Sequence, residues 1–287
     1  MNFCIIIPAH NEEEVIEKCL DSLINQSYPA NEIIVVDDHS TDQTAQIVSK
    51  FRQVNPSIKL VHNTSSEAHQ PGEKIINAFY KGVENIEYAY QVICKFDADL
   101  IFPPNYLSEL KANFEANSKL GMVAGFCYIE NEHGQWVKEK LTNDEHIRGP
   151  LKAYRKQCFE DIGGLIKAMG WDTLDELLAR FQAWETKTLP QLHVKHLKPT
   201  GQRYSKELAK RFGSALYQMD YGLVLSFLSL LKIALLKKKL SFLIQGLTSY
   251  FKAIYKRPQK LVTKEEGRFI RNYRWKKIKI KIFKSHE

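Results

Sequence analysis

Regular alternation of short apolar runs with amphipathic segments over the first hundred residues constrains the fold most. Largely apolar runs of strand length lie at residues 3–7, 32–36, 58–61 and 91–96. Because these runs lack polar alternation, they predict strands that are buried on both faces. Apolar side chains at helical spacing lie between them, at residues 12–26, 43–51 and 74–83. The pattern therefore predicts an α/β fold with a mainly parallel sheet flanked by helices.

Polar side chains follow three of these predicted strands at the point where each strand ends. They lie at residues 8–12, at residues 37–42, and at Asp97 and Asp99. In parallel α/β sheets, ligands bind beyond the carboxyl ends of the strands. The three clusters are therefore predicted to face one binding site.

Asp97 and Asp99 are the most informative of these side chains. They lie two residues apart at the end of a strand, and the side-chain period of two turns both carboxylates to one face. Two neighbouring anions are costly unless a cation joins them, and a hard divalent ion with oxygen ligands suits them. Such an ion retains room for diphosphate oxygens. Alone, the motif also fits a solvated turn, so its meaning depends on the other clusters.

The next hundred residues are less regular. Residues 105–117 indicate a helix after Pro103 and Pro104, and residues 121–129 indicate a strand. A glycine pair, Gly163 and Gly164, precedes a helix that is predicted to run to about residue 184. Residues 193–196 indicate a short extended segment.

The net charge of +8 conceals two regions of opposite sign. Residues 1–200 contain 20 Lys and Arg against 28 Asp and Glu, whereas residues 201–287 contain 21 against 5. The asymmetry predicts one domain over residues 1–200 and a second, basic and helical region over residues 201–287, each with different partners.

The five cysteines are widely spaced and form no Cys-x-x-Cys pattern. This usage indicates reduced thiols, a cytosolic protein and no structural zinc site. The first residues lack the basic start of a signal peptide, so none is expected.

Taken in order, these clusters resemble a family 2 glycosyltransferase with the GT-A fold. The resemblance covers about residues 1–200. It rests on Ile-Ile-Ile-Pro-Ala-His-Asn-Glu-Glu at 5–13, Ile-Val-Val-Asp-Asp-His-Ser-Thr-Asp-Gln-Thr at 34–44, Asp97-Ala98-Asp99, Gly163-Gly164 and Trp171-Asp172. Each motif alone is of moderate specificity, but their joint occurrence in this order is specific. The resemblance implies a nucleotide-binding GT-A domain that uses a nucleotide-sugar donor.

The resemblance assigns the donor base to the first two clusters. Pro8, Ala9 and Glu12 would pack on the base, and Asp38 would accept a hydrogen bond from it. Capping of the following helix beside Ser40 and Thr41 is an equally good interpretation of Asp38.

The diphosphate end of the donor would be bound by the third cluster. Asp97 would contact the ribose, and Asp99 would bind Mg²⁺ or Mn²⁺, which neutralises the leaving diphosphate. His196 would help to bind the metal or the diphosphate, although His193 is an open alternative. Lys74 matches a helix start near the diphosphate loosely and can equally be a solvated charge.

Inverting transfer also needs a general base for the acceptor hydroxyl. By resemblance this base is Asp172, and Trp171, where the family more usually has Glu, would stack on a sugar ring. Asp175 lies on the same helix face and could be the base instead or bind an acceptor hydroxyl. Acidic residues at a helix start are also favoured by the helix dipole alone. The remaining acceptor-side predictions are Arg148, Gly163 and Gly164, which would border the acceptor cleft.

The basic region contains two apolar segments, at residues 221–236 and 240–255, and ends in a basic, aromatic stretch at residues 268–284. The first segment falls short of the roughly 20 residues that span a bilayer. The composition is typical of helices that lie in a membrane interface, so a membrane surface is an expected partner. The alternative is a helical hairpin packed on the catalytic domain. No motif indicates a nucleic-acid partner, and the acidic half of the chain opposes one.

The resemblance, together with the composition of the basic region, implies a metal-dependent inverting glycosyltransferase on the cytosolic face of the cell membrane. It would move a sugar from a nucleotide donor, with UDP-sugars as the first guess, to a hydroxyl of a glycan or lipid-linked acceptor in surface polysaccharide biosynthesis. One alternative is a sugar nucleotidyltransferase, although the loop at residues 8–12 lacks the Gly-rich, basic character expected of one. A second alternative is a non-catalytic, membrane-associated protein that binds nucleotide sugars.

Overall fold

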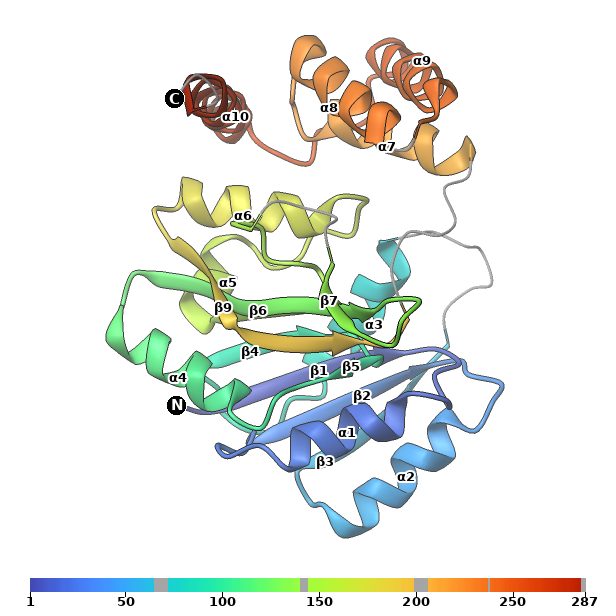
Figure 1. Ribbon diagram of the computed structural model, residues 1–287, viewed down its shortest axis with the longest axis vertical. Coiled ribbons are helices and arrows are strands. Elements are labelled where there is room, and N and C mark those ends of the chain that lie inside the picture. Colours follow the sequence, from blue (N-terminus) through green and yellow to red (C-terminus); the bar gives the residue numbers. More distant parts are fainter. Residues whose placement is uncertain (65–71, 140–143, 199–205, 237, 285–287) are drawn as a thin grey trace. The chain divides into compact units, whose positions relative to one another are not determined.

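A computed structural model describes residues 1–64, 72–139, 144–198, 206–236 and 238–284 (Figure 1). The chain divides into two compact units. Unit 1 comprises Met1–Lys167 and Trp171–Thr200, and unit 2 comprises Ala168–Gly170 and Gly201–Glu287.

The first half of unit 1 is a parallel sheet. Its strands are β1 (Phe3–Ala9), β2 (Glu32–Asp38), β3 (Ile58–Asn63) and β4 (Val92–Phe96). They lie in the order β3-β2-β1-β4, and every adjacent pair is parallel. The connecting helices are α1 (Ile16–Ile24), α2 (Thr44–Val54) and α3 (Glu73–Val83). The apolar residues of β1, β2 and β4 are largely buried, as lack of alternation predicts, whereas in the edge strand β3 only Ile58 is buried and Leu60 and Val61 are half-buried. The parallel α/β arrangement is confirmed here.

The second half makes the sheet mixed. Its strands are β5 (Leu100–Ile101), β6 (Leu120–Glu130), β7 (Trp136–Lys138), β8 (Leu151–Arg155) and β9 (Glu185–His196). β8 runs antiparallel to both β4 and β6, whereas β9 runs parallel to β6 and antiparallel to β5. The sheet is therefore mainly parallel only up to β4. The antiparallel insertion of β8 brings residues 148–155 alongside the end of β4.

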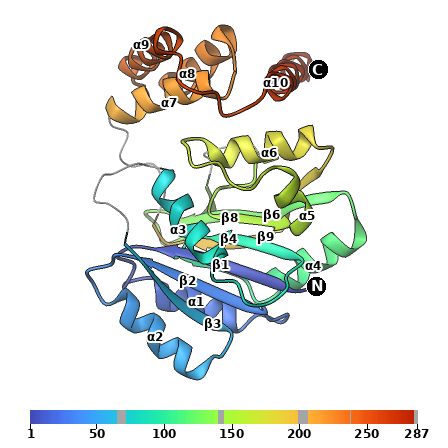
Figure 2. The same ribbon diagram turned by 180° about the vertical axis from the view of Figure 1, so that it is seen from behind.

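Helices cover both faces of this sheet. The remaining helices of unit 1 are α4 (Tyr106–Ala116), α5 (Lys156–Asp161) and α6 (Trp171–Phe181). Figures 1 and 2 show α1, α2 and α4 against one face and α3, α5 and α6 against the other. Because β1 runs parallel to both β2 and β4, the carboxyl ends of these three strands lie at one edge of the sheet.

Unit 2 is helical. Its helices are α7 (Lys206–Gln218), α8 (Leu223–Leu236), α9 (Leu240–Lys256) and α10 (Lys264–Lys284). α9 packs on both α7 and α8, and a Cβ atom at Gly213 would collide with the backbone of Gly246, so glycine allows α7 and α9 to approach closely. Arg271 of α10 forms an ion pair with Asp220, which precedes α8. Within the ranges that the structure describes, we find no helix with both the length and the apolar character needed to cross a membrane.

Candidate active site

The loops after β1 and β2 are tied together by hydrogen bonds. Thr41 donates its backbone N–H to the side chain of Asn11 (2.8 Å), and Glu12 donates its N–H to Thr44 Oγ1 (2.8 Å). Asn11 has a φ of 55°, a left-handed conformation that Asn tolerates. Of the residues predicted to pack on the donor base, Pro8 and Ala9 end β1, with Ala9 only 3% exposed, and Glu12 lies in the loop that is bonded to the β2–α2 segment.

Asp38 is buried at the end of β2 and accepts a hydrogen bond from Asn63 Nδ2 (2.8 Å). α2 begins at Thr44, and the side chain of Asp42 accepts a hydrogen bond from the backbone N–H of this residue (2.9 Å). The β2–β3 register pairs Asp38 with Asn63 and Asp37 with His62. Sequence reasoning missed Asn63 and His62, although the predicted parallel register of β2 and β3 was a signal that could have found them.

Asp97 has a buried cationic partner that sequence reasoning missed. Lys95, 1% exposed, forms an ion pair with Asp97, whose side chain remains 25% exposed. Because Lys95 and Asp97 are two residues apart at the end of β4, they lie on one face. The ammonium group lies 5.4 Å from the centroid of the Trp171 ring. The carboxylate of Asp97 is therefore held in position while staying accessible.

Asp99 and His196, the two residues predicted to bind the metal, lie close together although 97 positions separate them in the sequence. Antiparallel pairing of β5 with β9 places Leu100 opposite His196, and Asp99 Oδ2 lies 3.2 Å from His196 Nε2. His193 lies three residues earlier in β9 and is therefore on the opposite face, exposed and against the ring of Tyr128. Of the two histidines, His196 is the one beside the acidic motif.

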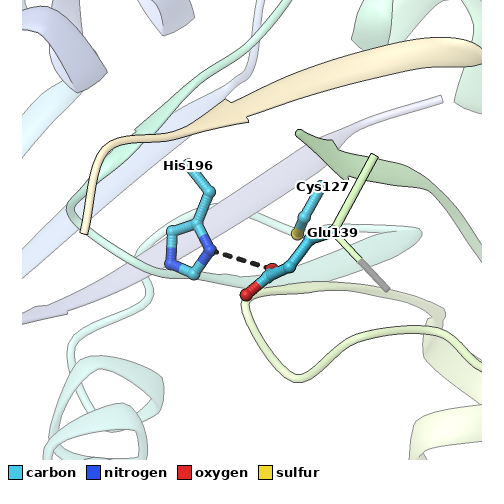
Figure 3. Close-up of side chains that lie close together, drawn as sticks. All are labelled: Cys127, Glu139 and His196. Carbon is cyan, nitrogen blue, oxygen red and sulfur yellow. Dashed lines mark hydrogen bonds and ion pairs between the residues drawn. The ribbon is translucent and has the colours of Figure 1, made fainter. Parts of the chain in front are cut away.

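The other ring nitrogen of His196 is also held, because His196 Nδ1 lies 3.2 Å from Glu139 Oε2 (Figure 3). Glu139 in turn forms an ion pair with Arg148. We call Asp99, His196, Glu139 and Arg148 the metal-side cluster. Burial lowers the pKa of His196, but hydrogen bonds to Asp99 and Glu139 outweigh it and raise this pKa to about 9. Burial opposes ionisation of Glu139, yet its bonds with His196 and Arg148 lower its pKa.

The metal-side cluster suits a divalent cation. Two ligand atoms 3.2 Å apart, Asp99 Oδ2 and His196 Nε2, are close to the roughly 3 Å that separates adjacent ligands of an octahedral ion with bonds of about 2.1 Å. Cys127, Glu139 and His196 also offer ligand atoms within 4.8 Å of one another (Figure 3). Burial raises the pKa of the Cys127 thiol to about 12, so this thiol stays protonated and is a poor ligand. The Asp99 side of His196 is the better place for a hard ion.

The start of α6 separates the two candidate bases. The side chain of Asp172 is 37% exposed and lies 3.9 Å from His146 Nε2. Asp175 is 3% exposed, and its carboxylate accepts hydrogen bonds from Lys152 (3.0 Å) and from the hydroxyl of Tyr154. Of the two, Asp172 is the one open to an acceptor.

Asp175 belongs to a second buried group of charges, which we call the α6-side cluster: Lys152, Asp175, Glu176 and His146. Lys152 Nζ also lies 3.3 Å from Glu176 and donates to the backbone carbonyl of Asp172 (2.6 Å). Burial lowers the pKa of Lys152, but the three acidic residues around it outweigh burial and raise it. Burial raises the pKa of Asp175 to about 6. For Glu176, burial is outweighed by Lys152 and His146, which lower its pKa to about 2.

Two acceptor-side predictions, Trp171 and Gly164, meet surroundings that oppose their predicted roles. Trp171 is 7% exposed, with Lys95 and Lys152 against its ring, which leaves little of the ring for the predicted sugar stacking. Gly164, with a φ of 76°, lies against the hydroxyl of Tyr80, which bonds both the N–H (2.7 Å) and the C=O (3.0 Å) of Leu165. Tyr80 thus occupies the space that the prediction reserved for a sugar at Gly164.

Gly163, Arg148 and Lys74 lie in three different surroundings. A Cβ at Gly163 would have nothing within 4 Å, so this glycine borders open space. Arg148 is directed to Glu139 in the metal-side cluster. Lys74 lies half-buried in the first turn of α3.

Residues 149 and 150 contact both the end of β4 and the start of α6. Lys95 donates to the carbonyl of Gly149 (3.5 Å), and the N–H of Asp97 donates to Pro150 (3.1 Å). A Cβ at Gly149 would lie 3.3 Å from the Cβ of Asp172. The start of β8 therefore brings the end of β4 and the start of α6 to one place, with Asp97 and Asp172 on either side.

A mixed α/β sheet with acidic side chains at the carboxyl ends of its parallel strands is the architecture of the GT-A glycosyltransferases. The family model described as "Glycosyl transferase family 2" matches residues 4–171, and the chain belongs to this family.

Curated relatives agree with this assignment. The chain is 31% identical over 190 residues to "Probable glycosyltransferase YdaM" of Bacillus subtilis (strain 168), covering 59% of this chain and 44% of the relative. It is 31% identical over 187 residues to "Poly-beta-1,6-N-acetyl-D-glucosamine synthase" of Staphylococcus epidermidis, covering 58% and 41%. The aligned part thus spans less than half the length of these relatives.

Solved structures share the fold. The S. aureus TarS fragment 1-349 in complex with UDP-GlcNAc has a TM-score of 0.63 at 19% identity, covering 90% of this chain and 82% of that one. The mannosyltransferase PcManGT from Pyrobaculum calidifontis, in complex with GDP-Man and Mn²⁺, has a TM-score of 0.57 at 17% identity, covering 88% and 75%. At these identities the likeness shows the GT-A fold.

Proposed function

We propose that this protein is a metal-dependent, inverting glycosyltransferase. It transfers one sugar from a nucleotide-sugar donor to a hydroxyl of a glycan or lipid-linked acceptor in surface polysaccharide biosynthesis. The observation that carries this proposal is the buried pair of Asp99 and His196, 3.2 Å apart, in which Asp99 closely follows Asp97 at the end of β4. Membership of the family and the names of the relatives support it.

In this proposal Asp99 and His196 hold Mg²⁺ or Mn²⁺, which neutralises the leaving diphosphate when bound. The ion pair with Lys95 fixes Asp97 beside the ribose. Asp38 accepts a hydrogen bond from the base, beside the β1–α1 and β2–α2 loops. UDP-GlcNAc, bound by TarS, and GDP-Man with Mn²⁺, bound by PcManGT, are the first donors and metal to test.

We assign the general base to Asp172 rather than to Asp175. A base must come within hydrogen-bond reach of the acceptor hydroxyl, and Asp172 is partly exposed. Asp175 is enclosed by Lys152 and Tyr154 of β8, so its role in this proposal is to hold α6 in place against that strand. Lys152 contacts both this carboxylate and the backbone carbonyl of Asp172 and thereby fixes the start of the helix.

The test measures sugar transfer and donor hydrolysis with a panel of UDP- and GDP-sugars, with and without Mn²⁺. Asp99→Ala is expected to abolish both the turnover and the rise in melting temperature that donor and Mn²⁺ together produce. Asp172→Asn is expected to lower transfer about 10²–10⁴-fold, the usual contribution of a general base, while that rise persists. Asp21→Asn, an exposed acid on α1, is the matched control and should change neither readout.

Two results would contradict parts of this proposal. Binding of nucleotide sugars without any turnover would leave the non-catalytic alternative standing. Full transfer by Asp172→Asn, together with loss of transfer in a folded Asp175→Asn variant, would move the base to Asp175.

A further inference from the structure

Helix α9 carries apolar side chains on two well-separated sides. One side is buried within unit 2 and consists of Phe242, Gly246, Tyr250 and Ala253. The other side follows the spacing i, i+4, i+7, i+11, i+14, i+15, which keeps its members on one face of a helix. We call this second set the outer stripe: Leu240, Ile244, Leu247, Phe251, Ile254 and Tyr255.

The outer stripe is exposed. Leu240 is 66% exposed and Ile244 59%, and Leu247 is half-buried. Farther along, Phe251 is 52% exposed and Tyr255 89%. An unpartnered apolar face of this length on a soluble unit indicates an interaction surface.

Further exposed apolar side chains lie nearby in the sequence. Leu235 and Leu236, each 69% exposed, end α8 directly before α9 begins. In unit 1, by contrast, the large apolar residues with such exposure among those described are Val54, Tyr88 and Val137, which lie on separate elements. Exposed apolar surface is therefore concentrated in unit 2.

The charge around the outer stripe is of one sign. Residues 221–263 contain eight Lys or Arg and no Asp or Glu. Exposed cations flank the stripe at its start (Lys238 and Lys239) and towards its end (Lys252, Lys256 and Arg257). An apolar stripe flanked by cations is complementary to an apolar layer whose surface carries negative charge.

We propose that the outer stripe and its flanking cations dock on an anionic lipid surface, with α9 lying in the plane of the interface. The apolar side chains would enter the acyl boundary while the lysines meet the lipid phosphates and acidic headgroups. A second copy of the chain fits less well, because it would bring two cation-only surfaces together. This inference goes beyond the proposed sugar transfer and does not rest on it.

The test uses the full chain and sedimentation with lipid vesicles. Binding to vesicles of phosphatidylcholine with about one third phosphatidylglycerol is expected to be at least about tenfold tighter than to phosphatidylcholine alone, and to weaken with salt. The double variant Ile244→Ser/Phe251→Ser is expected to weaken binding at least about tenfold. Lys252→Gln/Lys256→Gln should weaken it by about fivefold for each cation removed.

The matched control is Val54→Ser/Tyr88→Ser, which removes two exposed apolar side chains from unit 1 and should leave binding unchanged. Far-ultraviolet circular dichroism checks that each variant keeps its helices. Absence of binding to anionic vesicles would overturn the proposal, as would equal losses in the stripe and control variants. A dimer that the stripe substitutions dissociate, without vesicle binding, would assign the surface to self-association instead.

Discussion

The two buried clusters of unit 1 contain similar residue types but differ in how their charges are balanced. In the α6-side cluster, the fully buried ammonium group of Lys152 lies within 3.3 Å of both Asp175 and Glu176. In the metal-side cluster, Asp99 faces the imidazole of His196, a group that exchanges its proton and also binds metals. Asp175 and Glu176 thus share a permanent cation, whereas Asp99 faces a side chain whose charge depends on its protonation.

This difference separates structural from chemical carboxylates. Asp175 and Glu176 are enclosed and fully partnered, whereas Asp97 and Asp172 keep 25% and 37% of their side chains exposed. Exposure therefore differs among the acidic residues at the end of β4 and at the start of α6. Enclosure by Lys152 favours a role for Asp175 and Glu176 in holding α6 and β8 together, and contact with ligands is our proposal for Asp97 and Asp172.

The largest expected effect is that of Lys152→Met, which removes the permanent cation. Two buried carboxylates would lose their common partner, and breaking a buried ion pair typically costs about 3–5 kcal/mol. We expect a loss of this size in the free energy of unfolding, measured by urea denaturation. Because Asp172 also loses the bond to its backbone carbonyl, sugar transfer should fall as well.

Lys156→Met is the control for this prediction, because Lys156 is an exposed residue 3.8 Å from Glu160 on the solvent side of α5. Its free energy of unfolding should change by less than about 1 kcal/mol. Equal effects of the two substitutions would remove the distinction between an enclosed cluster and a surface pair.

The parallel half of the sheet could be predicted from sequence because its signals are local. Each strand from β1 to β4 is an apolar run, and each helix between them shows its own periodicity. β8 was missed because Lys152 and Arg155 interrupt its apolar pattern. Lys152 is buried there only because Asp175 and Glu176, more than twenty residues later, neutralise it. A partner so distant leaves no signal in the strand itself.

For the candidate site, sequence reasoning likewise found the local motifs but missed the residues that contact them from distant parts of the chain. The Asp-x-Asp motif at the end of β4 was evident, and the resemblance brought in Asp172 and His196. Glu139 and His146 were missed because they lie in an irregular stretch and become neighbours of the site only through the antiparallel strands. The two-residue spacing of Lys95 and Asp97 could have revealed their ion pair, but a buried lysine is rarely expected in a strand.

The pH dependence of stability offers a second, smaller measure of the α6-side cluster. The pKa of Glu176 in the folded protein is lowered to about 2, below its ordinary value of 4.5. Its contribution is therefore fully present above about pH 4.5 and is lost as the pH falls towards 2. By linkage this contribution is about 3 kcal/mol.

The measurement compares the free energies of unfolding of the original protein and Glu176→Gln between pH 3 and 6. The difference between them should be largest at pH 6 and shrink as the pH falls. Glu160→Gln, an exposed carboxylate on α5, is the control and should give a small difference that hardly changes with pH. A pH-independent difference for Glu176→Gln would mean that its charge is not held by Lys152 and His146.

The smallest expected effect tests the metal-side cluster through Glu139, which does not touch the proposed ion. Its carboxylate holds Nδ1 of His196 and so directs Nε2 towards Asp99. Partners of this kind usually change metal affinity by about 10–100-fold. Glu139→Gln should therefore weaken Mn²⁺ binding by that factor, measured by the electron paramagnetic resonance signal of free Mn²⁺ without any donor. Glu132→Gln, an exposed acid in the loop before β7, should leave the affinity unchanged. An unaltered affinity in Glu139→Gln would show that His196 keeps its orientation without this carboxylate, and the contrast between the two clusters would then rest on Asp99 alone.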